Sequence, residues 1–159
     1  MFEDDPGVEF RRARPEEAGT IQALVRRAYA KYLDRVAVAP KPMLADYETA
    51  VARHQMWLLR RDGVLTAVLE LIAEPDHLLV ENVAVAVAAQ GKGLGKRLMA
   101  FAEAVARRQG YAEVRLYTHE RFVENIALYR SIGYRETHRE QLPQKAVVHM
   151  AKSLANKQS

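Results

Sequence analysis

The sequence predicts an α/β protein built on a mixed, mainly antiparallel sheet of seven strands with helices on both faces. Three observations support this prediction. Segments with strand and helix patterns follow one another in the order β-α-α-β-β-β-α-β-α-β-β. Asp62 and Gly63 separate two apolar runs, as in the two-residue turn of a β-hairpin. A strand, a glycine-rich loop, a helix and another strand occupy residues 78–118, which predicts one parallel, right-handed crossover.

The amount of apolar sequence is sufficient for one folded domain. The chain has 159 residues and a mass of 18.0 kDa, with 49% hydrophobic and 28% charged residues. A chain of this length ordinarily forms a single core, and the sequence contains no repeat and no long linker. We therefore expect one domain over residues 1–159, with residues 155–159 as a loose tail.

The first elements follow from apolar spacing and from prolines. Residues 8–13 have the pattern of a strand, and Pro15 suits the first turn of the helix that follows. That helix has one apolar face, which comprises Ala18, Ile21, Leu24, Val25, Ala28 and Tyr32. Two prolines make residues 36–42 a loop, and a shorter helix is expected over about residues 43–53.

The remaining elements alternate between strand and helix patterns. Residues 56–61 and 64–73 flank the hairpin turn, and residues 78–87 are the most strand-like run of the chain. A glycine-rich loop at residues 90–95 opens a helix that Gly110 ends. The closing elements are a strand over residues 112–118, a helix from about Phe122 to Ile132 ended by Gly133, and strands over residues 134–140 and 145–154.

Composition argues against several classes of protein. The chain has no cysteine, and its five histidines lack a close ligand spacing, so we expect no metal site. A net charge of +4 is too small to indicate nucleic-acid binding by itself, although Arg11–Arg12 and Arg107–Arg108 leave that alternative open. The acidic N-terminus does not resemble a secretory signal, and no apolar run reaches the roughly 18 residues of a membrane span. We expect a cytoplasmic protein that binds neither membrane nor nucleic acid.

The glycine-rich loop at residues 90–96 (QGKGLGK) suits an anionic ligand, because glycines allow close backbone approach and the first amides of a helix point outward together. The P-loop pattern fails, since it requires glycine where Lys96 stands. The dinucleotide fingerprint fails at the same residue. The pattern Q/R-x-x-G-x-G/A is satisfied by Gln90, Gly93 and Gly95.

Two further segments accompany this pattern. A valine-rich run at residues 81–87 (ENVAVAV) precedes the loop, and residues 125–134 (NIALYRSIGY) follow it about thirty residues later. With these three segments the chain resembles the GNAT superfamily of acyl-CoA-dependent N-acyltransferases over most of its length. Two departures are small: Val87 stands where many members have proline, and Gln90 replaces a commoner arginine.

The resemblance implies transfer of an acetyl group from acetyl-CoA to a primary amine of a small molecule or peptide, directly in a ternary complex and without a metal. A homodimer is common among relatives. The loop would bind the pyrophosphate of coenzyme A, and the backbone of the valine-rich strand would pair with its pantetheine arm. The implied coenzyme A-binding residues are Val83, Ala84, Val85, Gln90, Gly91, Lys92, Gly93, Leu94, Gly95, Lys96 and Asn125. Lys92, Lys96 and Arg97 add positive charge near the loop.

Two catalytic residues are implied. Tyr129 corresponds to the tyrosine that protonates the leaving thiolate, although it could instead be a core residue. Glu81 is the candidate base. Strict alternation would place Glu81 on the face of Val83 and Val85, among apolar neighbours that raise the pKa of a carboxyl group. An ion pair with an arginine, or exposure at a bulge, is the alternative for Glu81.

Other residues have weaker claims to the site. Asn125 would bind pantetheine or cap a turn, and Glu120 and Glu124 are weaker candidates for the base. Residues near the expected acceptor pocket, each also compatible with core packing, are Tyr29, Tyr32, Tyr47, His54 and Trp57. The alternative function is a catalytically silent coenzyme A-binding module, which would keep the glycine loop and dispense with Glu81 and Tyr129.

Overall fold

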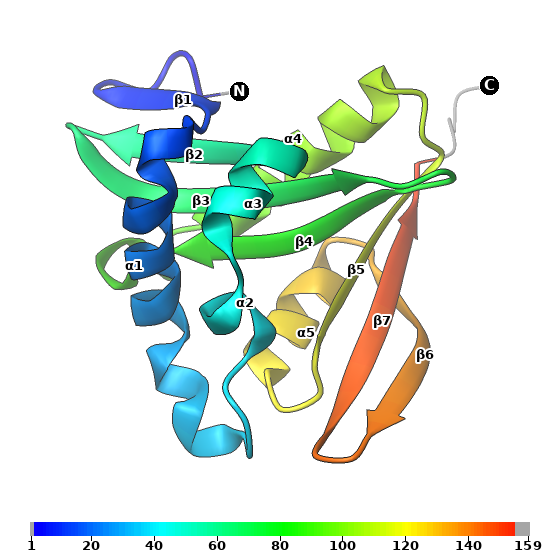
Figure 1. The fold of residues 1–159 in the computed structure, drawn as a ribbon. Coiled ribbons are helices and arrows are strands. Elements are labelled where there is room, and N and C mark those ends of the chain that lie inside the picture. Colours follow the sequence, from blue (N-terminus) through cyan, green and yellow to red (C-terminus); the bar gives the residue numbers. More distant parts are fainter. Residues whose placement is uncertain (1, 155–159) are drawn as a thin grey trace.

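The computed structural model describes residues 2–154 and confirms the α/β class, with a seven-stranded mixed sheet and helices on both faces (Figure 1). The expected tail at residues 155–159 lies outside the described residues. The strands are β1 (Val8–Arg12), β2 (Gln55–Arg61), β3 (Val64–Ala73), β4 (Leu78–Val85), β5 (Glu113–His119), β6 (Arg135–Leu142) and β7 (Lys145–Ser153). The α-helices are α1 (Ala18–Tyr29), α2 (Lys41–Leu44), α3 (Tyr47–Arg53), α4 (Leu94–Arg108) and α5 (Val123–Ser131).

The sheet has the strand order β1-β2-β3-β4-β5-β7-β6, and every neighbouring pair is antiparallel except β4 with β5. That parallel pair is the predicted crossover, since α4 connects its two strands. No helix within residues 2–154 is long and apolar enough to cross a membrane.

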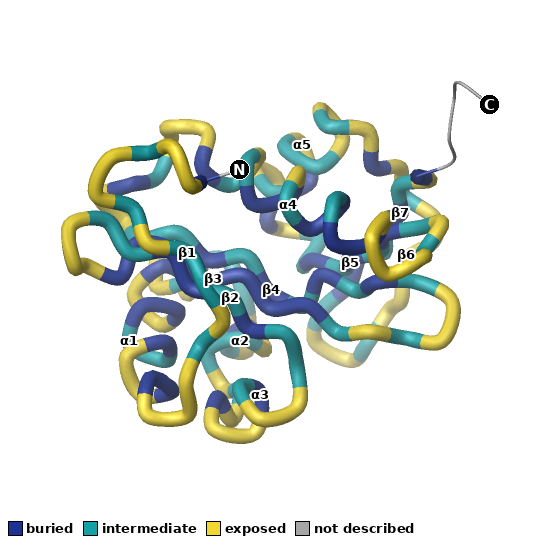
Figure 2. Tube along the Cα trace, turned by 90° about the horizontal axis from the view of Figure 1, so that it is seen from above, coloured by how far each residue is buried: buried dark blue, intermediate teal, exposed yellow. Residues whose placement is uncertain are grey.

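Helices cover both faces of the sheet, so each face has its own apolar core. On one face α1 and α3 pack over strand residues such as Met56 and Val68. On the other face α4 and α5 pack over residues such as Leu69 and Val80, together with Leu98 of α4. Figure 2 shows the consequence, with the strands buried between two helical layers whose outer surfaces are exposed.

Strands β4 and β5 pair over a short distance only. The ladder joins Leu78–Val80 to Val114–Leu116, and beyond it the two strands diverge toward the carboxyl end of β4 (Figure 1). Backbone groups on that side of residues 83–85 therefore face a gap between strands instead of a neighbouring ladder.

Strict alternation along β4 was a wrong prediction, because the strand contains a bulge at Glu81. Opposite β3, Glu70 pairs with Asn82 and Leu71 pairs with Val80, which leaves Glu81 as an extra residue. Val80 and Val83 consequently both pack on the α4 side of the sheet. Glu81 lies on the opposite side with Asn82, in a groove beside α3.

The helix expected over residues 43–53 is two helices. Residues 41–44 form α2, which starts inside the expected loop, and α3 begins at Tyr47. Asp46 separates them because its carboxylate accepts bonds from the amides of Glu48 and Thr49, at 3.1 and 3.3 Å, and so caps α3. The strand expected over residues 78–87 also ends early, at Val85, before a 3₁₀ turn at Val87–Ala89.

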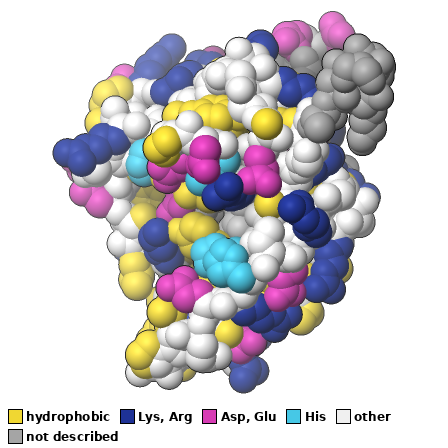
Figure 3. All heavy atoms as spheres, turned by 90° about the vertical axis from the view of Figure 1, so that its right-hand side faces the viewer, with side chains coloured by type: hydrophobic (Ala, Val, Ile, Leu, Met, Phe, Trp, Pro, Cys, Tyr) yellow, Lys and Arg dark blue, Asp and Glu magenta, His cyan; other side chains and the backbone are white. Residues whose placement is uncertain are grey.

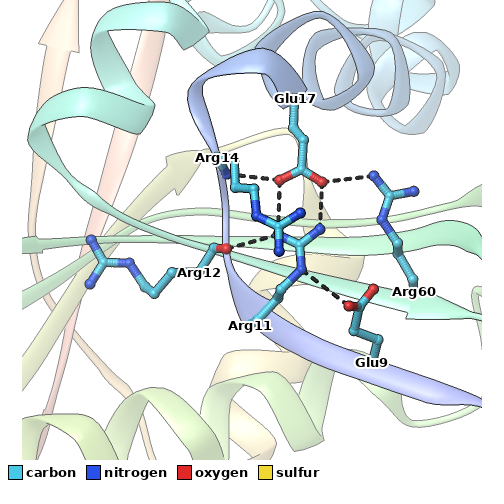
Figure 4. Close-up of polar contacts among 6 residues, drawn as sticks. All are labelled: Glu9, Arg11, Arg12, Arg14, Glu17 and Arg60. Carbon is cyan, nitrogen blue, oxygen red and sulfur yellow. Dashed lines mark hydrogen bonds and ion pairs between the residues drawn. The ribbon is translucent and has the colours of Figure 1, made fainter.

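A buried ion-pair cluster fixes the start of α1 against the sheet (Figure 4). Glu17 accepts bonds from both terminal nitrogens of Arg11 at 2.9 and 2.7 Å and from Arg60 at 2.9 Å. It also accepts the backbone amide of Arg14 at 2.7 Å. The bond from Arg11, outweighing the opposing effect of burial, holds the pKa of Glu17 well below its usual range.

Candidate active site

A cavity of about 490 Å³ opens where β4 leaves β5, and we call it the loop cavity. Its walls come from β4, the glycine loop, α4, α5 and the end of α1. Most of the implied coenzyme A-binding residues line it, namely Val83, Ala84, Val85, Gln90, Gly91, Gly93, Leu94, Gly95, Lys96 and Asn125. Tyr129 lines it as well.

The glycine loop has the backbone conformation that its sequence predicts. Gly91 and Gly93 have φ values of 79° and 82°, in the left-handed region that other residues rarely adopt. A Cβ atom built on either would meet no protein atom within 4 Å, so the loop's own packing does not exclude a side chain there. Because α4 begins at Leu94, the first amides of the helix lack intrahelical partners and offer donors to an anion.

Gln90 connects the loop to two other elements. Its Nε2 donates to the Val85 carbonyl at 2.9 Å, and its Oε1 accepts from Lys31 Nζ at 2.9 Å. Gln90 therefore holds the end of β4 in place and directs a cation to the rim of the cavity.

The cations near the loop take different positions. Lys96 lines the cavity, whereas Lys92 is exposed and is not among the lining residues. Arg97 pairs with Asp5 at 2.7 Å and stacks over Phe2, so it serves the N-terminal segment and not the loop.

Tyr129 is a residue of α5 that packs against the core and lines the loop cavity. Burial raises its pKa to about 12, with a smaller contribution from Tyr32. Asn125, one turn earlier on α5, accepts a long bond from Tyr32 Oη at 3.4 Å. The helical spacing thus places the amide and the phenol of the family motif on the same cavity wall.

Glu81 is bound by two polar partners, which corrects the expectation of apolar neighbours. Lys41 Nζ lies 3.1 Å from Glu81 Oε2. Tyr117 Oη donates to Glu81 Oε1 at 2.8 Å and accepts from Lys41 Nζ at 2.8 Å. The partner is a lysine from α2, and not an arginine. The Glu81 side chain is 15% exposed and that of Lys41 is 61% exposed, so Lys41 covers the carboxylate from the solvent side.

Charge and burial act together on this trio. Burial lowers the pKa of Lys41, but the bond to Tyr117 and the charge of Glu81 outweigh it, and the pKa lies above its usual value. Burial raises the pKa of Tyr117 to about 12, against the effect of the Lys41 bond. Lys41 is therefore charged and Tyr117 neutral near pH 7.

A second hollow, of about 510 Å³, lies on the α3 side of Glu81, and we call it the acidic groove. Its carboxylates are Asp46, Glu70, Glu74 and Glu81. His54 Nδ1 lies 2.6 Å from Glu70 Oε2. Burial raises the pKa of Glu70, and the His54 bond opposes that rise.

Asn82 organises the floor between the groove and the loop cavity. Its Oδ1 accepts from Tyr29 Oη at 2.9 Å, and its Nδ2 donates to Tyr47 Oη at 3.3 Å. Asn82, Lys41 and Tyr117 were not predicted as site residues from the sequence. The polar side chain of Asn82 within the most strand-like run could have indicated a site residue, whereas no neighbouring sequence feature distinguished Lys41 or Tyr117.

A narrow cleft of about 70 Å³ shares lining residues with both hollows and is lined in part by Glu81, Tyr117 and His119. His119 Nδ1 accepts the Arg121 amide at 3.0 Å, which leaves the proton on Nε2. That Nε2 is buried and has no partner within residues 2–154. His119 and Glu81 thus line the same cleft, and the buried Nε2 of His119 is an unpaired donor. Tyr29 lines both the cleft and the loop cavity.

Three of the weaker candidates do not fit the roles considered for them. Trp57 stacks on Phe10 at 5.3 Å between ring centroids, on the α4 side of the sheet, so it is core and not acceptor pocket. Glu120 lies 3.6 Å from Arg139. Glu124 lines the loop cavity, but its bidentate pair with Arg35 lowers its pKa to about 2 and so makes it a poor base.

One of the two arginine pairs considered for nucleic-acid binding, Arg11–Arg12, includes an arginine that is bonded to carboxylates within the protein. Arg11 bonds Glu9 and Glu17. Figure 3 shows the side of the molecule formed by β6 and β7, where basic, acidic and histidine side chains are intermixed. This face does not present the continuous basic surface that phosphate binding requires.

Known proteins resemble this chain in sequence. The sequence profile of the acetyltransferase (GNAT) family matches residues 20–134. A 64-residue stretch is 39% identical to N-alpha-acetyltransferase 80 of Mus musculus, and it covers 40% of this chain but only 19% of that protein.

Solved structures agree over nearly the whole chain. The PaiA N-acetyltransferase of Thermoplasma acidophilum, in complex with coenzyme A, superposes with a TM-score of 0.77 over 92% of this chain and 98% of that one, at 17% identity. The ribosomal-protein-S18-alanine N-acetyltransferase of Escherichia coli gives 0.75 over 96% and 98%, at 18% identity. Identities this low establish a shared fold and no more.

Proposed function

Because the chain belongs to the acetyltransferase (GNAT) family and is an acyltransferase, we propose that it transfers an acetyl group from acetyl-CoA to a primary amine. The transfer is direct, within a ternary complex of donor, acceptor and enzyme. The acceptor is a small molecule or a peptide, and one domain spanning residues 1–159 carries both sites.

The observation that carries this proposal is the meeting of the glycine loop with the divergence of β4 and β5 at one cavity. Outward amides at the start of α4, with Lys96 and Lys31 nearby, suit the pyrophosphate of coenzyme A. The free side of residues 83–85 suits an extended amide-containing arm, because such an arm can pair with the strand backbone. The thioester supplies an activated acyl group.

The proposed chemistry divides between two residues. Glu81 accepts one proton from the acceptor ammonium, which frees the nitrogen lone pair for attack on the thioester carbon. A new C–N bond forms, the C–S bond breaks, and the thiolate takes the proton of Tyr129 Oη. The nitrogen then loses its second proton to water, and Tyr129 regains a proton from water, which completes the neutral amide. Lys41 must leave the Glu81 carboxylate before an external amine takes that position, since the ammonium now lies 3.1 Å from it.

Two features support a cationic acceptor with a nearby carbonyl group. The carboxylates of the acidic groove favour cations over anions. The buried, unpaired Nε2 of His119, a residue that lines the cleft, would donate to a carbonyl oxygen of the acceptor, as in a peptide N-terminus, once a movement of the side chain exposed it. Similar folds include Arabidopsis thaliana Naa50 with a bisubstrate peptide analogue, at a TM-score of 0.72, and nourseothricin acetyltransferase, at 0.71.

Acetyl-CoA turnover across a panel of amines tests the proposal, with free thiol as the readout. The panel contains peptide N-termini, lysine side chains, polyamines and aminoglycoside-like compounds. We expect amine-dependent thiol release with at least one class. Binding of coenzyme A without release for any amine would contradict the proposal and favour the catalytically silent module.

A further inference from the structure

Lys41 presents a primary amine at the position that the proposed function reserves for the acceptor. Its Nζ lies 3.1 Å from the Glu81 carboxylate and donates to Tyr117 Oη at 2.8 Å. Tyr117 in turn donates to the other oxygen of Glu81 at 2.8 Å. A base that removes a proton from a substrate ammonium requires contact of this kind.

The segment that carries Lys41 brings the amine in from the acceptor side. Lys41 is the first residue of α2, after Pro40, and its side chain is 61% exposed, while its ammonium contacts the Glu81 side chain, which is 15% exposed. Lys41 and Glu81 both line the narrow cleft. Tyr29 forms a wall of that cleft and also a wall of the loop cavity, so the two hollows adjoin at this side chain.

We propose that Lys41 is a self-acetylation site, at which the enzyme acetylates its own side chain in the absence of an external amine. This inference rests on the proposed function. Glu81 takes one proton from the Lys41 ammonium, and the neutral nitrogen attacks the thioester carbon of acetyl-CoA. The C–N bond forms, the C–S bond breaks, and the departing sulfur receives a proton from Tyr129. The nitrogen loses its second proton to water, Tyr129 regains a proton from water, and Glu81 releases the proton it took. The products are acetylated Lys41, coenzyme A as its free thiol, and one proton released to water.

The other lysines near the site are placed differently, which makes the inference specific. Lys31 donates to Gln90 at 2.9 Å, at the rim of the loop cavity. Lys145 lines the same narrow cleft as Lys41, yet the contacts of the Glu81 carboxylate are with Lys41 and Tyr117. Lys145 is therefore the control lysine, because it shares the cleft with Lys41 but does not contact Glu81. Its labelling rate measures the acetylation that proximity to the cleft produces without the base.

Acetylation would change the site that performs it. An acetylated Lys41 carries no charge, so its ion pair with Glu81 is lost and the carboxylate becomes available to another amine. The ion pair also keeps the ammonium protonated, so we expect this reaction to be slow compared with turnover of a good external acceptor.

The test is incubation of the purified protein with isotopically labelled acetyl-CoA, followed by peptide mapping by mass spectrometry. Lys41 should acquire label about tenfold faster than Lys145, because its amine is already positioned at the base. The rate per molecule should not change with protein concentration, as expected for reaction within one chain. In Gly93→Asp, which blocks the donor site, labelling of Lys41 should fall to the level of Lys145.

Equal labelling of Lys41 and Lys145, or a rate that rises in proportion to protein concentration, would overturn the inference. Thiol release with external amines is measured on the same preparation. Turnover of an amine without label on Lys41 would refute self-acetylation and leave the proposed function intact. If neither reaction occurs, the proposed function itself fails.

Discussion

Replacement of Tyr129 by phenylalanine tests the proposed general acid most directly. The change keeps the ring and its packing against the core and removes only the hydroxyl group. Burial raises the pKa of Tyr129 to about 12, whereas a thiol has a pKa near 8.5. The difference corresponds to about 5 kcal/mol for full proton transfer from phenol to thiolate. A turnover of about 10 s⁻¹ has a barrier of about 16 kcal/mol, so a donor this weak is still compatible with catalysis.

We expect Tyr129→Phe to lower kcat by about 10²-fold while coenzyme A binding stays close to that of the wild type. The loss should shrink for acyl donors whose thiols have lower pKa values, because a better leaving group needs less protonation. The Tyr129 hydroxyl stays protonated up to a pH of about 12. Below pH about 10, the alkaline side of the kcat profile should therefore have the same shape in the wild type and in Tyr129→Phe. Steady-state kinetics over pH with two donors, and calorimetry for binding, supply the data.

An unchanged kcat in Tyr129→Phe would refute the assignment and leave Tyr129 as a core residue. A loss of the same size for every donor thiol would also count against proton donation, because it would indicate misplaced substrate instead. Ser131→Ala, also on α5 but absent from the cavity lining, is a matched control that should retain wild-type kinetics.

Three further predictions follow from other parts of the structure. Coenzyme A at a hundredfold excess over its Kd should stabilise the fold by about 2.7 kcal/mol, which corresponds to a rise in Tm of roughly 5–10 °C. Gly93→Asp should abolish this rise. Gly110→Asp, the control at a similar φ outside the loop cavity, should retain it. Glu81→Gln should lower turnover by about 10²–10⁴-fold and keep the thermal shift, and normal turnover would transfer the role of base to another group. Glu17→Gln should cost about 2 kcal/mol in urea unfolding at pH 7. Because the folded-state pKa of Glu17 is depressed, its contribution is present above the unfolded value near 4.3 and declines as the pH falls below it, so the variant should lose less stability on acidification.

Local patterns were sufficient to predict the element order, because hairpin turns, glycines and helical spacing each act over a few residues. The pairing within the sheet agrees with that order. The break at Asp46 was missed because capping by its side chain competes with helix continuation, and the apolar spacing does not register that competition.

The bulge at Glu81 could not be predicted from alternation. Burial alternates without interruption along β4, since helices cover both faces of the sheet and an apolar residue is buried on either side. The extra residue is apparent only from the pairing with β3. The segments that line the loop cavity could be found in the sequence because each motif is contiguous, whereas Lys41 and Tyr117 reach Glu81 from 40 and 36 residues away.

The bulge has a consequence for sequence alignment. Since Glu81 is an inserted residue, the residues before and after it keep consecutive partners on β3, and the bulge alone accommodates the extra position. Removal of Glu81 would restore regular alternation along β4, with Val80, Val83 and Val85 still on the α4 side, and would take the carboxylate away from the groove beside α3. Substitutions in this stretch leave the bulge in place. A relative that aligns with a one-residue gap here should therefore not share the Glu81 site, however similar its glycine loop.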